Sequence, residues 1–135
     1  MTEKVKAVFD ESMLATLATV SEDGSPWATP VHVVTDGAAV YWFSSEEADH
    51  SRNIARTGKV SAALFSRDFS NGLKGVYMRG TARIVPEDER NTIVSLYGER
   101  AGFFPRAFSE MAVYRLELGQ LDEKKSTGNC WYFYS

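Results

Sequence analysis

The sequence predicts a mainly β domain of six or seven antiparallel strands with short helices inserted, closed as a small barrel or sandwich. Three observations support this prediction. Short runs rich in Thr, Val, Leu and aromatic residues alternate with turns, two of which contain Asp-Gly. The first three runs lie too close together for crossover helices, which disfavours a parallel sheet. The 135 residues, 44% of them hydrophobic, are ordinary for one globular domain, here residues 1–135.

The first elements expected are a helix and a three-stranded meander. Thr2 is a suitable N-cap, and apolar residues follow it with helical spacing at Val5, Val8 and Phe9. A strand over 13–20 (MLATLATV) ends at Asp23-Gly24, where a type I′ hairpin turn is expected. A second strand over 27–34 ends at a similar turn over 35–37, and a third strand covers 38–44 (AAVYWFS).

The second half is expected to continue with two helices and further strands. A helix over 45–57 closes at Gly58, a strand covers 59–66, and a polar loop over 67–74 turns at Asn71-Gly72. A strand over 75–85 precedes Pro86, which suits the first position of a helix. That helix should bury Ile93, Leu96 and Tyr97. Strands over 111–118 and 131–134 complete the prediction.

Composition excludes several classes of protein. The net charge is −3 without a Lys/Arg block, so nucleic acid is not an expected partner. No apolar run approaches the ~18 residues that span a membrane, so no membrane partner is expected. His32, His50 and Cys130 lack paired spacing, so no metal site is expected. One cysteine fits a reducing compartment, and we predict a cytoplasmic protein.

One candidate site lies at the start of the predicted middle helix. His50, Ser51 and Arg52 stand together there, where unpaired N–H groups and the helix dipole favour a phosphate. The alternative is a solvated helix face on which Arg52 pairs with a nearby carboxylate, Glu47 or Asp49. From the residues alone the alternative is favoured, because three acidic side chains surround the proposed anion: Glu46, Glu47 and Asp49.

The ordered set of motifs resembles the FMN-binding split β-barrel of the pyridoxamine 5′-phosphate oxidase-like proteins, above all their short members. The motifs are LATLATV, an SEDGS turn, PWATPVHVV, VYWFSS, HSRNI and KVSAALF, followed later by GVYMRGTARIV. The resemblance covers about residues 13–83 and is weaker in the final strands. It implies a split β-barrel that forms a homodimer, with two FMN sites at the subunit interface.

The resemblance also implies which residues contact the cofactor. Positions along the isoalloxazine ring correspond to Thr29, Pro30, Val31 and His32. Phe43 and Ser44 approach the ribityl phosphate. Where the family has a phosphate-binding pattern like S-x-K-x-R-N-L, Ala48 replaces the serine and His50 the lysine, followed by Ser51, Arg52 and Asn53. The remaining implied contacts are Gly75 and Val76 on the later strand, and Trp131 with Tyr132 covering the ring from the partner subunit.

The implied function is an FMN-dependent oxidoreductase acting on a small molecule, and no catalytic residue is identified. The full pyridoxamine phosphate oxidases carry C-terminal basic residues for the substrate phosphate. This chain shows no such cluster, so oxidation of vitamin B6 is not expected. Two alternatives remain open. One is a non-catalytic flavin- or haem-binding stress protein, with His32 or His50 as the axial haem ligand. The other is a deazaflavin-dependent reductase on the same fold.

Overall fold

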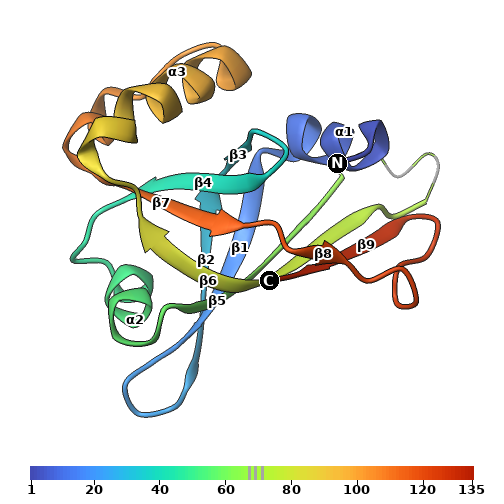
Figure 1. The fold of residues 1–135 in the computed structure, drawn as a ribbon, viewed down its shortest axis with the longest axis horizontal. Coiled ribbons are helices and arrows are strands. Elements are labelled where there is room, and N and C mark those ends of the chain that lie inside the picture. Colours follow the sequence, from blue (N-terminus) through green and yellow to red (C-terminus); the bar gives the residue numbers. More distant parts are fainter. Residues whose placement is uncertain (67, 69, 71) are drawn as a thin grey trace.

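The computed structural model describes residues 1–66, 68, 70 and 72–135, and it is mainly β, as predicted (Figure 1). The polar loop predicted over 67–74, with its Asn71-Gly72 turn, lies partly outside the described residues. The helices are α1 (Glu3–Ser12), α2 (Asp49–Thr57) and α3 (Arg90–Ala101), with 3₁₀ segments η1 (Glu87–Glu89) and η2 (Arg106–Glu110). The strands are β1 (Leu14–Val20), β2 (Pro26–His32), β3 (Val34–Thr35), β4 (Ala39–Ser44), β5 (Lys59–Phe65), β6 (Gly75–Ile84), β7 (Ala112–Glu117), β8 (Gln120–Leu121) and β9 (Cys130–Tyr134).

The strands form one curled sheet in the order β2-β1-β5-β6-β7-β4-β3, and neighbours along this path are antiparallel. The result is a half-barrel, which confirms the predicted fold class. One pairing departs from the antiparallel pattern, since β9 lies parallel to β6. On one edge of β6, β7 pairs with residues 82–84 and β9 pairs with residues 75–79. The two strands together leave little of this edge unpaired.

The first hairpin forms where Asp23-Gly24 predicts it, but its turn is not type I′. A type I′ turn needs positive φ at both central residues. Gly24 has a φ of +89°, whereas Met13 is the one non-glycine residue with positive φ in the described part of the chain. Ser21 accepts from the Gly24 N–H at 2.9 Å and donates to the Ser25 carbonyl at 2.8 Å, which closes a three-residue loop. The glycine supplies the left-handed residue that such loops require.

The second predicted strand, over 27–34, is broken at Val33. The Val33 N–H donates to the Met13 carbonyl at 2.9 Å, and the chain then crosses to pair β3 with β4. Val33 packs in one hydrophobic cluster and Val34 in another. Consecutive apolar residues on a strand normally face opposite sides. At this corner hydrophobic clusters cover both sides of the chain, so both valines are apolar. The continuous apolar sequence therefore does not indicate that the strand breaks here.

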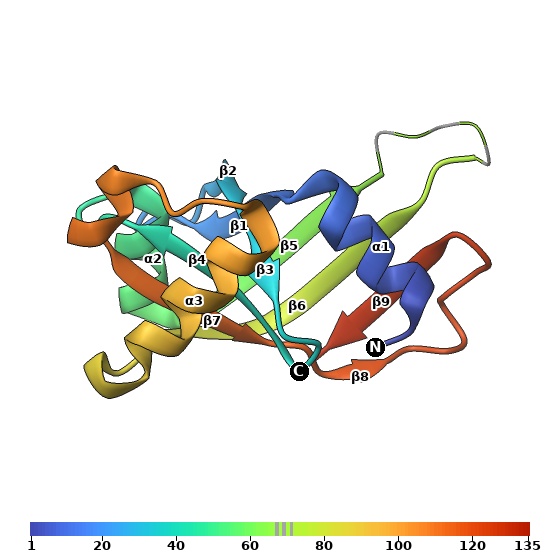
Figure 2. The ribbon, with the colours of Figure 1, turned by 90° about the horizontal axis from the view of Figure 1, so that it is seen from above.

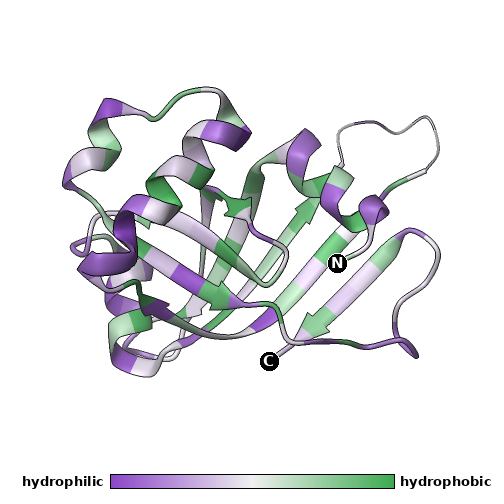
Figure 3. Cartoon of the chain, turned by 45° about the horizontal axis from the view of Figure 1, so that its top comes forward, coloured by the Kyte–Doolittle hydropathy of each residue, from purple (hydrophilic) through white to green (hydrophobic). Residues whose placement is uncertain are grey.

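Two hydrophobic clusters lie on the two faces of β4, all of whose residues are buried. Val40 and Trp42 face the interior of the half-barrel, while Ala39, Tyr41 and Phe43 face α3. Figure 2 shows α3 beside β4 and β7, with α1 across the other end of the sheet. Hydrophobic and hydrophilic segments both occur along the strands and along the helices (Figure 3).

The helices confirm the predicted elements with shifted boundaries. Thr2 caps α1 by accepting from the Val5 N–H at 3.4 Å. The middle helix starts at Asp49 instead of residue 45, because Ser45 forms a turn in which its Oγ accepts from the Glu47 N–H at 3.2 Å. Pro86 precedes η1, so α3 begins four residues later than expected. No helix in the described ranges is long and apolar enough to cross a membrane.

Asp36 is expected to stabilise the hairpin between β3 and β4. Its Oδ1 accepts from the N–H groups of Ala38 and Ala39, both at 2.9 Å, and its Oδ2 accepts from the Tyr41 hydroxyl at 2.9 Å. Asp36→Ala should lower the free energy of unfolding by about 1–3 kcal/mol, because it removes the acceptor from three donors. Urea unfolding at pH 7 measures this loss.

The pH dependence and a matched variant test the same role. Burial alone would raise the pKa of Asp36, but the hydrogen bonds from Ala38, Ala39 and Tyr41 lower it overall. Its contribution is therefore present above the ordinary carboxyl pKa and is lost as the pH falls through the lowered value. Asp23→Ala removes the acceptor of one exposed turn N–H, that of Ser25, and should cost less. Equal losses for the two variants would contradict this role of Asp36.

Candidate functional site

The predicted site residues gather around the junction of β2 and β4. The strand order begins with β2 and ends with β4 and β3, and the curl of the sheet brings β2 against β4. Among the described pairings, β2 forms its ladder with β1 alone. Ladder pairing therefore stops between β2 and β4, and we call this junction the split. Helix α2 packs against β1, β2, β5 and β6 next to it (Figure 1).

A buried polar pair lies where β4 ends and α2 begins. His50 Nε2 lies 2.9 Å from Ser44 Oγ, and both residues are at least nine-tenths buried. Burial lowers the pKa of His50 below its ordinary value, while the nearby Asp49 carboxylate opposes this shift. The imidazole is therefore neutral near pH 7. Ser44 and His50 were both predicted as phosphate contacts, and the structure brings them together.

The first turn of α2 supplies further hydrogen-bond donors. Its N-cap residue, Ala48, is extended and makes no side-chain capping hydrogen bond. Residues that normally cap a helix supply an oxygen for the first N–H groups, and an alanine has none. The helix therefore presents backbone donors, together with the positive end of its dipole, close to His50.

Two more predicted residues hold α2 against the sheet. Asn53 Nδ2 donates to Thr19 Oγ1 at 3.0 Å in a buried hydrogen bond that joins α2 to β1. Ser51 is buried beside Tyr114, on a different side of the helix from His50. Thr19 is buried in β1, and no sequence signal paired it with Asn53.

Arg52 lies apart from the buried pair. Its guanidinium donates to Glu47 Oε2 at 2.5 Å, and both side chains are largely exposed. The structure thus has the arrangement that the local charges favoured, a solvated helix face with Arg52 paired to a carboxylate. Arg52 and His50 are two residues apart on the helix, which directs their side chains to different faces. A contact between Arg52 and the cofactor phosphate stays a prediction.

The predicted contacts on β2 alternate between the two sides of the sheet. Val31 is buried in the interior, Thr29 is half-buried, and Pro30 and His32 are exposed. His32 Nδ1 lies 3.4 Å from the Tyr97 hydroxyl of α3, a partner that sequence reasoning did not identify. The residues predicted along the flavin ring are therefore brought to the split, with Pro30 and His32 facing solvent.

Four other predicted contacts do not join the buried pair of Ser44 and His50: Phe43, Gly75, Val76 and Trp131. The ring of Phe43 packs among three aromatic residues under α3: Tyr97, Phe104 and Phe108. Gly75 and Val76 begin β6, where their neighbours in the register are Cys130 and Trp131. Gly75 and Val76 are buried, and Trp131 packs partly buried against the interior cluster. One chain thus gathers Ser44, His50 and the β2 residues, but not Gly75, Val76 or Trp131.

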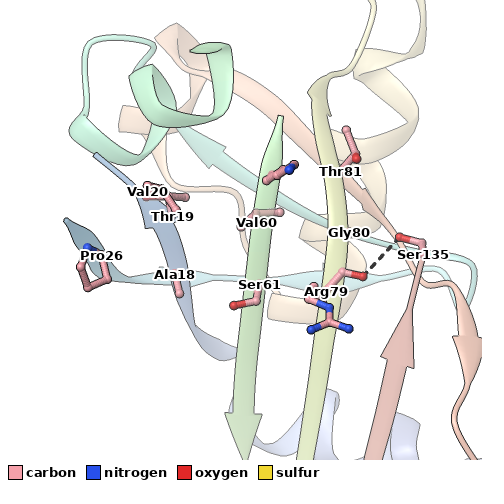
Figure 4. A pocket seen from close by; sticks show the side chains of 11 residues that line it. Ala18, Thr19, Val20, Pro26, Val60, Ser61, Arg79, Gly80, Thr81 and Ser135 are labelled. Carbon is pink, nitrogen blue, oxygen red and sulfur yellow. Dashed lines mark hydrogen bonds between the residues drawn. The ribbon is translucent and has the colours of Figure 1, made fainter. Parts of the chain in front are cut away.

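The convex face of the sheet carries a separate hollow of about 500 Å³ (Figure 4). It is lined by residues of β1, β5 and β6 together with the C-terminal Ser135, whose Oγ donates to the Arg79 carbonyl at 3.5 Å. None of the predicted cofactor contacts lines it. Aligned rows of small residues cross this face, since Ala18 lies opposite Ser61 and Thr16 opposite Ala63.

Comparison with solved structures finds the same fold in several proteins. HutZ, described as a haem storage protein of Vibrio cholerae, matches with a TM-score of 0.73 and 22% identity, over 87% of this chain and 89% of HutZ. An FAD-binding protein of Mesorhizobium loti, mll6688, matches with a TM-score of 0.67 and 18% identity, over 89% and 91% of the two chains. At these identities the likeness shows the fold alone.

Other comparisons concern length and family. The chain spans 55% of the protein Atu2129 from Agrobacterium tumefaciens, which it matches over 86% of its own length with a TM-score of 0.66 and 21% identity. A search of the curated proteins found no significant match. The family model described as pyridoxamine 5′-phosphate oxidase matches residues 1–125. With its half-barrel, its split and this match over most of its length, the chain belongs to the pyridoxamine 5′-phosphate oxidase family.

Proposed function

We propose that this chain binds FMN at the split and uses it in redox chemistry on a small molecule. The observation that carries the proposal is the buried Ser44–His50 pair beside the uncapped first turn of α2. A hydroxyl, an imidazole and free backbone N–H groups at a helix N-terminus are suitable donors for a phosphate. The family match and the flavin in the description of mll6688 support the same cofactor.

The residues at the split have distinct parts in this proposal. Bound FMN would supply the redox chemistry by transferring hydride or single electrons through its ring. Ser44 donates to a phosphate oxygen, and His50 either donates or carries a positive charge beside it. Asn53, tied to Thr19, holds α2 in place so that these donors converge. The exposed side of β2, with Pro30 and His32, lies along the ring.

We further propose a homodimer that uses the convex face of the sheet, with the cofactor sites at the subunit interface. Three large apolar residues on the strands of this face are between 44% and 54% exposed: Leu14, Val20 and Phe65. Between them lie small residues, and the rings of Tyr77 and Tyr132 stack with centroids 4.7 Å apart. Exposed apolar area of this kind is typical of an interface, and a two-fold pairing is the commonest closed solution.

A cytoplasmic location also stays a prediction.

An absorbance spectrum and a titration test the cofactor. Reconstituted with FMN, the purified protein should retain flavin absorbance after gel filtration and quench flavin fluorescence in proportion to its concentration. A Soret band in the purified protein would favour haem, and deazaflavin bands would favour the third cofactor. If FMN fails to bind a folded protein, the proposal is wrong.

A second candidate function, haem binding, rests on His32. Its imidazole is exposed on β2, and the contact from Nδ1 to Tyr97 leaves Nε2 available as an axial ligand. His50 does not fit this part, because it is buried and its Nε2 already faces Ser44. The haem storage described for HutZ supports the candidate. His32→Ala should remove a Soret band, and His50→Gln should leave it unchanged.

His50 should make FMN binding depend on pH. In the free protein burial lowers the pKa of His50, whereas a bound phosphate dianion favours the charged imidazole. Binding then takes up a proton, so FMN affinity rises as the pH falls from 8 toward 6. His50→Gln keeps a donor but cannot titrate, so its FMN affinity should rise less over the same range.

Calorimetric titration of both proteins with FMN and with riboflavin measures this difference. The second pKa of the FMN phosphate lies near 6 and affects both proteins alike, so the difference between them isolates His50. Asp49, which adjoins His50, and Glu46, in the preceding turn, are present in both proteins, so they do not contribute to this difference. Parallel FMN profiles for the two proteins would remove His50 from the phosphate site.

A further inference from the structure

A second cavity, of about 350 Å³, lies between α1, the beginning of β6 and β9. Figure 2 shows α1 crossing this end of the sheet, away from α2. The register places Trp131 of β9 beside Val76, whereas α2 ends next to Ala82, six residues further along β6. The cavity is therefore separated from the split by much of the length of β6, and its volume suits a single-ring ligand.

One stripe of α1 forms the upper wall of the cavity. Lys4, Ala7, Val8 and Glu11 line it, and their spacing of three and four residues places them on one helical face. Val8 is buried against the sheet, and Ala7 leaves space beside it because its side chain is small. A stripe of two small apolar residues between two charged ends suits a ligand with an apolar body and a charged group.

Trp131 supplies an aromatic surface in this cavity. It packs partly buried against the interior cluster, on the side of β9 that also carries the buried Phe133. The preceding loop is held in place, because the Gly75 N–H donates to the Asn129 carbonyl at 2.8 Å. The indole is therefore held at a fixed wall of the cavity, where a planar ring can contact it.

The charges favour an anionic ligand. Lys4 and Lys74 bring ammonium groups from two different segments. Glu11 is the acidic residue among the described lining, and its Oε1 already accepts from the Ser66 hydroxyl at 2.7 Å and from the Asp68 N–H at 2.8 Å. Asp68 attracts Lys74, but its Oδ1 accepts from the Ser70 hydroxyl at 2.6 Å and from the Ser70 N–H at 3.0 Å.

We propose that this cavity is a second binding site, which takes a small aromatic carboxylate. The ring lies against Trp131, Ala7 and Val8, and the carboxylate lies between Lys4 and Lys74. The site lies apart from the split, and Trp131 is the one predicted cofactor contact among its described lining residues. The ammonium groups of Lys4 and Lys74, which both line the slot, distinguish the carboxylate from a neutral ring of the same shape.

Benzoate is the probe that tests the proposal. In spectra of the ¹⁵N-labelled full chain, the indole N–H resonance of Trp131 should shift and saturate with a dissociation constant on the order of 1 mM. The indole resonances of Trp27 and Trp42 serve as internal references and should stay in place. Benzamide, which has the same shape without the charge, should bind more weakly.

Matched variants locate the binding. Lys4→Gln and Lys74→Gln should each weaken benzoate binding about 2- to 5-fold, as expected for partly exposed ion pairs. Lys6→Gln changes the same charge on the same helix outside this cavity and should have no effect. Ala7→Trp should fill the slot and abolish binding while the fold is retained. A Trp131 resonance that never moves, or equal weakening by Lys4→Gln and Lys6→Gln, would overturn the site.

Discussion

Ser44→Ala is expected to weaken FMN binding by about 10- to 100-fold and to leave riboflavin binding nearly unchanged. The Ser44 hydroxyl is buried and lies 2.9 Å from His50 Nε2, so both groups converge on one point near the first turn of α2. A hydrogen bond to a charged group contributes about 1.5–3 kcal/mol, and about 1.4 kcal/mol corresponds to a factor of ten in affinity. Riboflavin lacks the phosphate, so it does not depend on these donors.

Fluorescence titration of both ligands measures the effect, and Ser45→Ala is the matched control. The Ser45 hydroxyl accepts from the Glu47 N–H in the same connection but is exposed. Ser45→Ala should therefore reproduce any loosening of the turn without the loss of a phosphate contact. If Ser44→Ala weakened FMN and riboflavin equally, the phosphate would not lie at this helix.

Arg52→Ala distinguishes the two interpretations of Arg52, as part of a solvated helix face or as a contact to the cofactor phosphate. Because Arg52 is exposed and paired with Glu47, we expect its removal to weaken FMN less than Ser44→Ala does. If Arg52 instead separates from Glu47 and binds the phosphate, Arg52→Ala should weaken FMN binding as much as Ser44→Ala does. In that case Glu47→Gln should strengthen FMN binding. Titration of both variants with FMN and riboflavin decides between these outcomes.

Ala63→Glu is expected to convert the proposed homodimer into a monomer. Ala63 lies on the central strand β5, where the register aligns it between Thr16 and Tyr77 on the convex face. Two-fold pairing through this face would bury both introduced carboxylates without partners. An unpaired charge buried at an interface costs about 2–5 kcal/mol, which raises the dimer dissociation constant by about 30-fold to more than 1,000-fold.

Sedimentation velocity measures the change, and Ala107→Glu is the control. Ala107 is exposed in η2, away from the sheet face, so the same substitution should leave the oligomeric state unchanged. Ala63→Glu should also lose FMN if the cofactor sites require both subunits. A wild-type protein that sediments as a monomer at micromolar concentration would refute the homodimer. Retention of FMN by a folded monomer would show that one chain is sufficient for binding.

The order of elements was determined by local signals in the sequence. Short runs rich in Thr, Val, Leu and aromatic residues predicted strands such as β1 and β5, Thr2 marked the start of α1, and the Asp-Gly pairs marked both hairpins. These signals act within a few residues, where backbone sterics and capping dominate. The set of motifs also led to the correct family, because it reflects the whole order of strands and turns.

Tertiary structure alone decided which side chains meet. Ser44 and His50 become a buried pair because Ser45 turns the chain before α2, and Arg52 faces solvent because α2 presents its opposite side to the sheet. The break at Val33 and the parallel pairing of β9 with β6 depend on edges that exist only once the sheet has curled. Spacing along a strand or helix sets the direction of each side chain, but contacts across elements depend on packing between distant segments, which local periodicity does not encode.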